Sequence, residues 1–140
     1  MNIMHFNTGP LYVNTYLVFD GSGKAFVVDP GGPSRQLEET IGVRGLDLEY
    51  IILTHGHCDH IGGVARMKKD LPVMFVSGDC DPVGDYGKGV IRSYKSFLKA
   101  GMTDVTMKLY HGGRHEMLNE INNDEVYQDI LGWINVKIGR

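Results

Sequence analysis

The sequence lacks several features that would assign it to a specialised class of protein. No apolar run approaches the roughly 18 residues of a membrane-spanning helix, and the first residues have neither the charged nor the apolar region of a signal peptide. The 14 basic and 17 acidic residues form no basic cluster of the kind that binds nucleic acid. We therefore expect a cytoplasmic protein with no membrane partner and no nucleic-acid partner.

Cysteine is also scarce, since Cys58 and Cys80 are the two cysteines of the chain. In a reducing compartment we expect two free thiols rather than a disulfide. The chain has 140 residues, of which 42% are hydrophobic and 22% charged, as is typical of one globular domain. No linker or internal repeat divides it, so we predict a single fused domain over residues 1–140.

The pattern of apolar and turn-forming residues predicts an α/β fold. Three short strands separated by Gly, Pro and Asp predict an antiparallel meander at the start of the chain. Strands and helices then alternate, which predicts a partly parallel mixed sheet with helices packed on it. The expected strands are residues 3–6, 12–19, 25–28, 46–53, 73–76 and 105–110, and the expected helices are residues 34–42, with Ser34 as N-cap, 60–70, 90–100 and 123–136.

A dense group of metal-binding residue types follows the predicted strand at residues 46–53. His55, His57, Asp59 and His60 place three imidazoles and one carboxylate within six residues. These donors suit zinc, manganese or iron, and a loop after a strand can direct them towards one point. A polar helix-capping loop would explain Asp59 but not three histidines. The pattern therefore predicts a site for one or two divalent ions, zinc or else manganese or iron.

His-x-His-x-Asp-His after a buried strand resembles the signature of the metallo-β-lactamase superfamily, especially its glyoxalase II-like hydrolases. The resemblance extends over roughly residues 1–72 and is supported by the segments 9–16 and 27–32. The family takes three further ligands, a histidine, a bridging aspartate and a last histidine, from downstream segments that this chain does not recognisably contain. The resemblance therefore implies an incomplete two-metal site.

Residue roles follow from the same resemblance. It implies that His55 and His57 bind one metal ion and that Asp59 and His60 bind a second. Asp29 would lie close behind these ligands, and a bridging water would be the nucleophile.

The second half, residues 72–140, resembles the C-terminal part of an α/β-hydrolase of the lysophospholipase or monoacylglycerol-lipase type. Segment 76–84 resembles the loop with the triad acid, which implies Asp81 in that role, and segment 112–117 resembles the loop with the triad histidine, which implies His115. The serine of such a triad normally lies in Gly-x-Ser-x-Gly, a pattern that the chain does not contain. Without that serine, a turn aspartate and an exposed loop histidine are the simpler interpretation.

The two resemblances meet near residue 72, as in a natural recombination or an engineered chimera. In an open α/β sheet, functional loops follow the carboxyl ends of the parallel strands. His55, Asp81 and His115 each follow a predicted strand, so we expect them at one edge of the sheet. We hypothesise that His115 or Asp81 completes the metal shell that the first half lacks. Exposed apolar surface or an unpaired strand edge in such a fusion would favour a homodimer.

Three functions are compatible with these observations. We favour divalent-metal binding with weak or absent catalysis, because the catalytic machinery of each parent family is incomplete and efficient catalysis needs a fully positioned site. The alternative is a metal-dependent hydrolase of small esters, thioesters or phosphoesters, with Asp59, Asp81 and His115 as candidate catalytic residues. The third interpretation is a folded chimera with neither metal nor activity.

Overall fold

The computed structural model describes residues 1–54, 63–64, 70–137 and 139. The motif residues His55, His57, Asp59 and His60 lie outside the described residues, as does most of the helix predicted over residues 60–70. Cys80 is a free, exposed thiol, as predicted.

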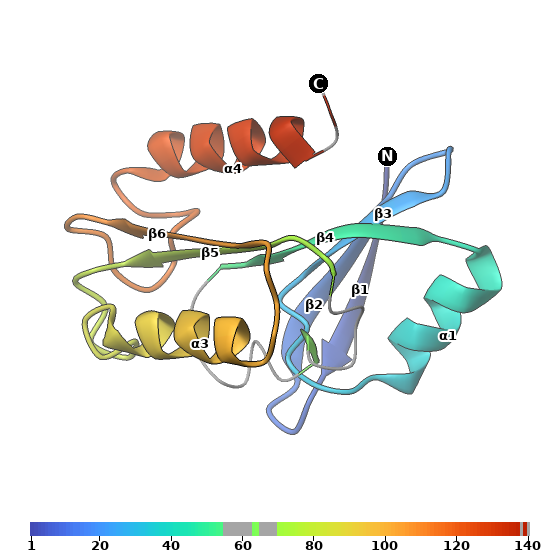
Figure 1. Ribbon diagram of the computed structural model, residues 1–140, viewed down its shortest axis with the longest axis horizontal. Helices are drawn as coiled ribbons and strands as arrows, with labels where there is room; N and C mark the ends of the chain where they lie inside the picture. Colours follow the sequence, from blue (N-terminus) through green and yellow to red (C-terminus); the bar gives the residue numbers. More distant parts are fainter. Residues whose placement is uncertain (55–62, 65–69, 138, 140) are drawn as a thin grey trace.

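Six strands form one mixed sheet, and their spatial order is the same as their order in the chain (Figure 1). The first three strands are antiparallel, and the last three add to the third in parallel. This confirms the predicted meander followed by a parallel sheet. The strands are β1 (Asn2–Thr8), β2 (Val13–Phe19), β3 (Lys24–Val28), β4 (Asp47–Leu53), β5 (Val73–Gly78) and β6 (Val105–Tyr110).

Helices cover both faces of the sheet (Figure 1). Helices α1 (Arg35–Arg44) and α3 (Lys88–Lys99) lie on one face, and α4 (Asn123–Lys137) lies on the other. The predicted N-cap is confirmed, because the Ser34 side chain accepts a hydrogen bond from the Leu37 N–H at 3.3 Å. In the part of the chain that the structure describes, no helix combines the length and the apolar character needed to cross a bilayer.

Strand β5, which lies between β4 and the edge strand β6, shows why both faces of the sheet are covered by helices. Val73 and Phe75 belong to the core cluster under α3, whereas Met74 and Val76 belong to the cluster under α4. All four side chains are at most 3% exposed. An uninterrupted apolar strand is therefore buried on both sides, as its composition predicts.

Polar contacts attach α4 to the edge strand β6. Lys108 forms ion pairs with Glu125 and Asp129, and the Tyr110 hydroxyl donates to Asp129 at 3.0 Å. The hydrogen bond from Lys108 holds the pKa of the Asp129 carboxyl below its usual value. In addition, the Trp133 indole N–H donates to the Thr106 hydroxyl at 3.0 Å. These contacts thus hold helix α4 against strand β6.

Candidate functional site

The carboxyl ends of β3, β4, β5 and β6 lie along one edge of the sheet, because these four strands are neighbours and parallel. The residues that follow them along this edge are Asp29 after β3, Thr54 after β4, Asp79 to Asp81 after β5, and His111 to His115 after β6. Asp81 and His115 therefore share an edge, as predicted. The strand that leads to His55 ends at the same edge.

Asp29 ties the end of β3 to the end of β4. Its carboxylate accepts hydrogen bonds from the Thr54 backbone N–H at 2.8 Å and from the Thr54 hydroxyl at 2.5 Å. The Asp29 carbonyl accepts from the Thr15 hydroxyl at 2.6 Å, and the side chain is buried. The backbone of Asp29 has a φ of 47°, an uncommon conformation that these bonds stabilise. Asp29 thus positions the residue immediately before His55.

The chain on the other side of the motif is anchored to the same place. The Gly63 N–H donates to the Pro30 carbonyl at 2.8 Å. A Cβ atom at Gly63 would lie 2.8 Å from the carbonyl oxygens of both Pro30 and Gly32, so only glycine fits between them. Both described ends of the motif segment, Thr54 and Gly63, are therefore attached to the turn after β3.

Asp81 and His115 form a direct pair, although they are 34 residues apart in the chain. The His115 Nδ1 lies 3.0 Å from the Asp81 carboxylate, and the same carboxylate accepts from the Val83 N–H at 2.9 Å. Asp81 is thus both the residue of an Asx turn and the partner of a histidine. Burial raises the pKa of Asp81, but the hydrogen bonds from His115 and from the Val83 and Gly84 backbone outweigh burial and keep this pKa below its usual value.

A cavity of about 340 Å³ opens beside this pair. Charged and amide side chains dominate its wall, which is lined by Asp81, Pro82, Val83, Arg114, His115, Glu116, Asn119 and Glu120. Asp81 is 1% exposed, whereas the His115 side chain is 41% exposed. The imidazole is therefore the part of the pair that meets solvent and that a ligand could reach.

A second histidine–aspartate pair lies next to the first. The His111 Nδ1 lies 2.9 Å from the Asp79 carboxylate, which also accepts from the Gly112 N–H at 2.8 Å. His111 belongs to none of the motifs recognised in the sequence, and sequence reasoning missed this contact. The sequence could have predicted this contact, because Asp79 directly follows β5 and His111 directly follows β6, and these two strands are parallel neighbours. The His111 side chain is 97% exposed, so this pair encloses no site.

Only part of the predicted site can be assembled from the described residues. Asp81 and His115 come together, and Asp29 lies at the predicted edge, whereas the four motif residues lie outside the description. Over residues 1–54, 63–64, 70–137 and 139, no three His, Cys, Asp or Glu side chains gather as a metal site. Among these residues the clearest chemical feature is the Asp81–His115 pair and its cavity.

Comparison with known proteins accounts for both halves. Residues 8–77 match the family model of the metallo-β-lactamase superfamily. The chain belongs to this superfamily. Residues 65–122 match a second family model, described as serine aminopeptidase, S33. The two matches overlap at residues 65–77, and together they confirm both resemblances seen in the sequence.

Two relatives that match the first half of the chain are described as hydrolases. Hydroxyacylglutathione hydrolase GloC of Haemophilus influenzae is 34% identical over 73 residues, which cover 52% of the chain and 34% of the relative. Probable metallo-hydrolase YqgX of Bacillus subtilis is 33% identical over 96 residues, which cover 65% of the chain and 45% of the relative. The chain thus spans under half the length of these curated relatives.

Two solved structures resemble the chain over part of its length. A crystal structure of BLEG-1 B3 metallo-β-lactamase has a TM-score of 0.49 and 31% identity, and the match covers 52% of this chain and 36% of the other. The structure of TTHA1623, described as di-iron-bound, has a TM-score of 0.47 and 28% identity. This match covers 77% of this chain and 52% of the other.

Proposed function

We propose that the chain binds one or two divalent metal ions of zinc type, or manganese or iron, through His55, His57, Asp59 and His60. Membership of the metallo-β-lactamase superfamily supports a metal-dependent protein. The observation that carries the proposal is the Asp29 carboxylate, which accepts from both the N–H and the hydroxyl of Thr54. Buried carboxylates that orient neighbouring ligand segments are a regular feature of metal sites.

The donor set fits such an ion. Three imidazoles and a carboxylate are the side chains that zinc and iron sites use most readily, whereas calcium and magnesium prefer oxygen donors alone. The described residues on either side of the segment that contains these donors, Thr54 and Gly63, are both hydrogen-bonded to the turn after β3. When bound, an ion of this kind polarises substrate oxygens and activates water for hydrolysis.

We place metal binding ahead of turnover. The sequence contains no Gly-x-Ser-x-Gly, the pattern that holds the nucleophilic serine in the α/β-hydrolase half. A second candidate function, hydrolysis of small esters, thioesters or phosphoesters, is favoured by the cavity beside Asp81 and His115. In that case the cavity binds the substrate, and either Asp59 or the Asp81–His115 pair, through its more exposed imidazole, accepts a proton.

The Asp81–His115 pair offers a further ligand to the metal. Histidines that bind metals usually hydrogen-bond a carboxylate through their other ring nitrogen, and His115 has this arrangement with Asp81. The pair lies at the sheet edge where β4 leads to His55. We therefore extend the proposal to His115, oriented by Asp81, as the ligand that completes the shell of the metallo-β-lactamase half.

The His115→Ala variant tests this extension. It should bind zinc about 10- to 100-fold more weakly than the unmodified chain, measured by competition with a chromogenic chelator. His111→Ala is the matched control, because His111 also bonds an aspartate through Nδ1 but is almost fully exposed. Equal affinities of both variants and the parent would show that His115 is not a ligand.

The proposed function itself is tested by the metal content of the purified chain. After expression without added metal, elemental mass spectrometry should find about one or two equivalents of zinc, manganese or iron. Dialysis against chelator should remove the ion, and re-addition should restore it and raise the melting temperature. A chain that contains no metal and whose stability is indifferent to chelator would instead be a folded chimera without a metal site.

A further inference from the structure

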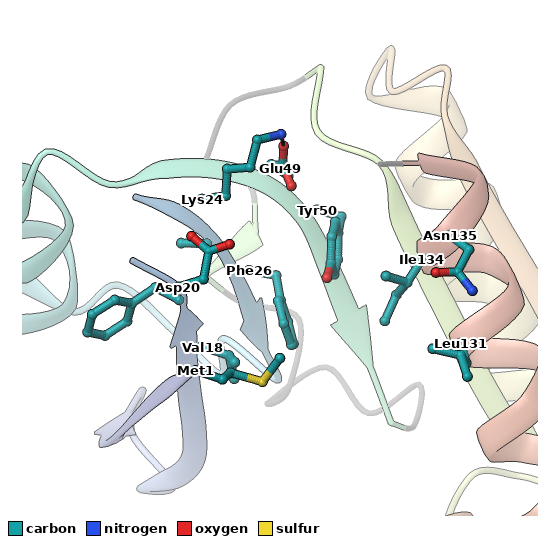
Figure 2. Close-up of a pocket in the computed structure, with 12 residues that line it drawn as sticks. Met1, Val18, Asp20, Lys24, Phe26, Glu49, Tyr50, Leu131, Ile134 and Asn135 are labelled. Atoms are coloured by element: carbon teal, nitrogen blue, oxygen red, sulfur yellow. Dashed lines mark hydrogen bonds and ion pairs between the residues drawn. The ribbon is translucent and has the colours of Figure 1, made fainter. Parts of the chain in front are cut away.

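A second cavity, also of about 340 Å³, opens on the face of the sheet that α4 occupies. Figure 2 shows it between strands β3 and β4 on one side and helix α4 on the other. The floor consists of Val18, Phe26 and Tyr50, which are cross-strand neighbours on one face of the sheet. Leu131 and Ile134 of α4 form the opposite wall. The body of the cavity is therefore apolar.

The ring of Tyr50 is held firmly in this cavity. It stacks on Phe26 with a centroid distance of 4.8 Å and an interplanar angle of 19°. The Trp133 ring meets it edge-on at 5.6 Å and 88°. Contacts of this geometry favour a single ring orientation. The residue as a whole is only 5% exposed.

The hydroxyl of Tyr50 is the polar group that this packing directs into the cavity. The hydroxyls of Tyr110 and Tyr127 have acceptors, Asp129 and the Leu118 carbonyl, but that of Tyr50 has no hydrogen-bond partner among the described residues. In Figure 2 its oxygen faces the space between Phe26 and Ile134. Burial, and then the charge of Glu49, raises the pKa of Tyr50 to about 12, so the hydroxyl stays a neutral donor.

The charged side chains at the mouth of the cavity already have hydrogen-bonding or ion-pair partners. Lys24 forms an ion pair with Glu49, and the Asp20 carboxylate accepts from the N–H and the hydroxyl of Ser22 at 2.8 and 2.6 Å. A charged ligand would have to displace these contacts. A neutral ligand would leave them intact and could still accept a hydrogen bond from Tyr50.

We propose that this cavity binds a small neutral organic molecule with an aromatic ring or short acyl chain and one carbonyl oxygen, which accepts from the Tyr50 hydroxyl. The volume lies in the range of small-molecule sites, and a mostly apolar wall with one placed donor is their usual composition. On β3 and β4 the lining residues are 24–26 and 49–50, none of which lies beyond the middle of its strand, whereas Asp29 and Thr54 follow the carboxyl ends of these strands. The site is thus independent of the proposed metal centre.

The test compares two probes of similar shape, acetophenone and ethylbenzene, of which only acetophenone has a carbonyl. Backbone-amide NMR titrations of the full chain should show shifts around Phe26, Tyr50 and Ile134 for both probes. Acetophenone should bind about 3- to 10-fold more tightly, as one neutral hydrogen bond allows. Tyr50→Phe should abolish this preference and retain ethylbenzene binding. The control Tyr86→Phe changes an exposed tyrosine outside the cavity and should keep the preference for acetophenone.

A second variant tests the cavity without changing Tyr50, in case Tyr50→Phe affects folding. Leu131 is 52% exposed, and Leu131→Trp should fill the cavity mouth and prevent binding of both probes while Tyr50 stays unchanged. The proposal is overturned if the preference for acetophenone persists in Tyr50→Phe, or if neither probe shifts the lining residues. It is also overturned if analytical ultracentrifugation finds a dimer that Leu131→Glu dissociates, because a second copy would then cover the cavity.

Discussion

Replacing His55 and His57 together with alanine is expected to reduce the bound metal from about one or two equivalents to less than about one tenth of an equivalent. The two imidazoles are half of the four donors in the motif, and the remaining carboxylate and histidine cannot alone satisfy a zinc-type ion. Since structural metal binding contributes to folding free energy, the variant should also lose the stabilisation that added zinc gives the parent chain.

The matched control for this loss is His5→Ala/His111→Ala, which also removes two imidazoles. His5 and His111 are exposed, and their imidazoles form hydrogen bonds with Asn14 and Asp79, respectively. The control should retain the full metal content, measured by elemental mass spectrometry on both proteins. Equal metal loss in the two variants would point to non-specific binding by surface histidines and against the motif.

Gly78→Ala is expected to destabilise the chain by more than about 3 kcal/mol. A Cβ atom at Gly78 would lie 2.0 Å from the Gly113 carbonyl oxygen and 2.5 Å from that of Arg114. These are backbone atoms, and the Gly113 carbonyl also accepts a hydrogen bond from the Cys80 N–H at 2.9 Å. The loop after β6 therefore cannot move away from Gly78 without losing this hydrogen bond. The substitution would therefore separate the loops that hold Asp81 and His115.

Urea unfolding monitored by circular dichroism measures this effect. The control is Gly42→Ala, since Gly42 lies in α1 with no atom within 4 Å of an added Cβ. Alanine there should stabilise the chain by about 0.5–1 kcal/mol, because it favours the helix. A Gly78→Ala variant as stable as the parent would show that the loops after β5 and β6 pack less closely than described.

Local sequence patterns were sufficient to predict the strands and most of the helices of the fold. The run Val73 to Val76 predicted a strand buried on both faces, and the structure places its alternate side chains under α3 and α4. Ser34 predicted the start of α1, because a serine hydroxyl in this position accepts a hydrogen bond from an N–H of the first helical turn. The helix predicted over residues 123–136 is α4, which ends one residue later, at Lys137, a difference of the kind that is common at helix ends.

Sequence alone determined the strands, most helices and the motif that marks the superfamily, because hydrophobic periodicity and short motifs are local properties of the chain. Only the tertiary structure decided the strand order, and with it the contact between Asp81 and His115 across 34 residues. It also decided that α4 packs on the opposite face from α1 and α3, which leaves Tyr50 facing a cavity. Such contacts depend on how whole elements pack against one another, and no local pattern specifies that packing.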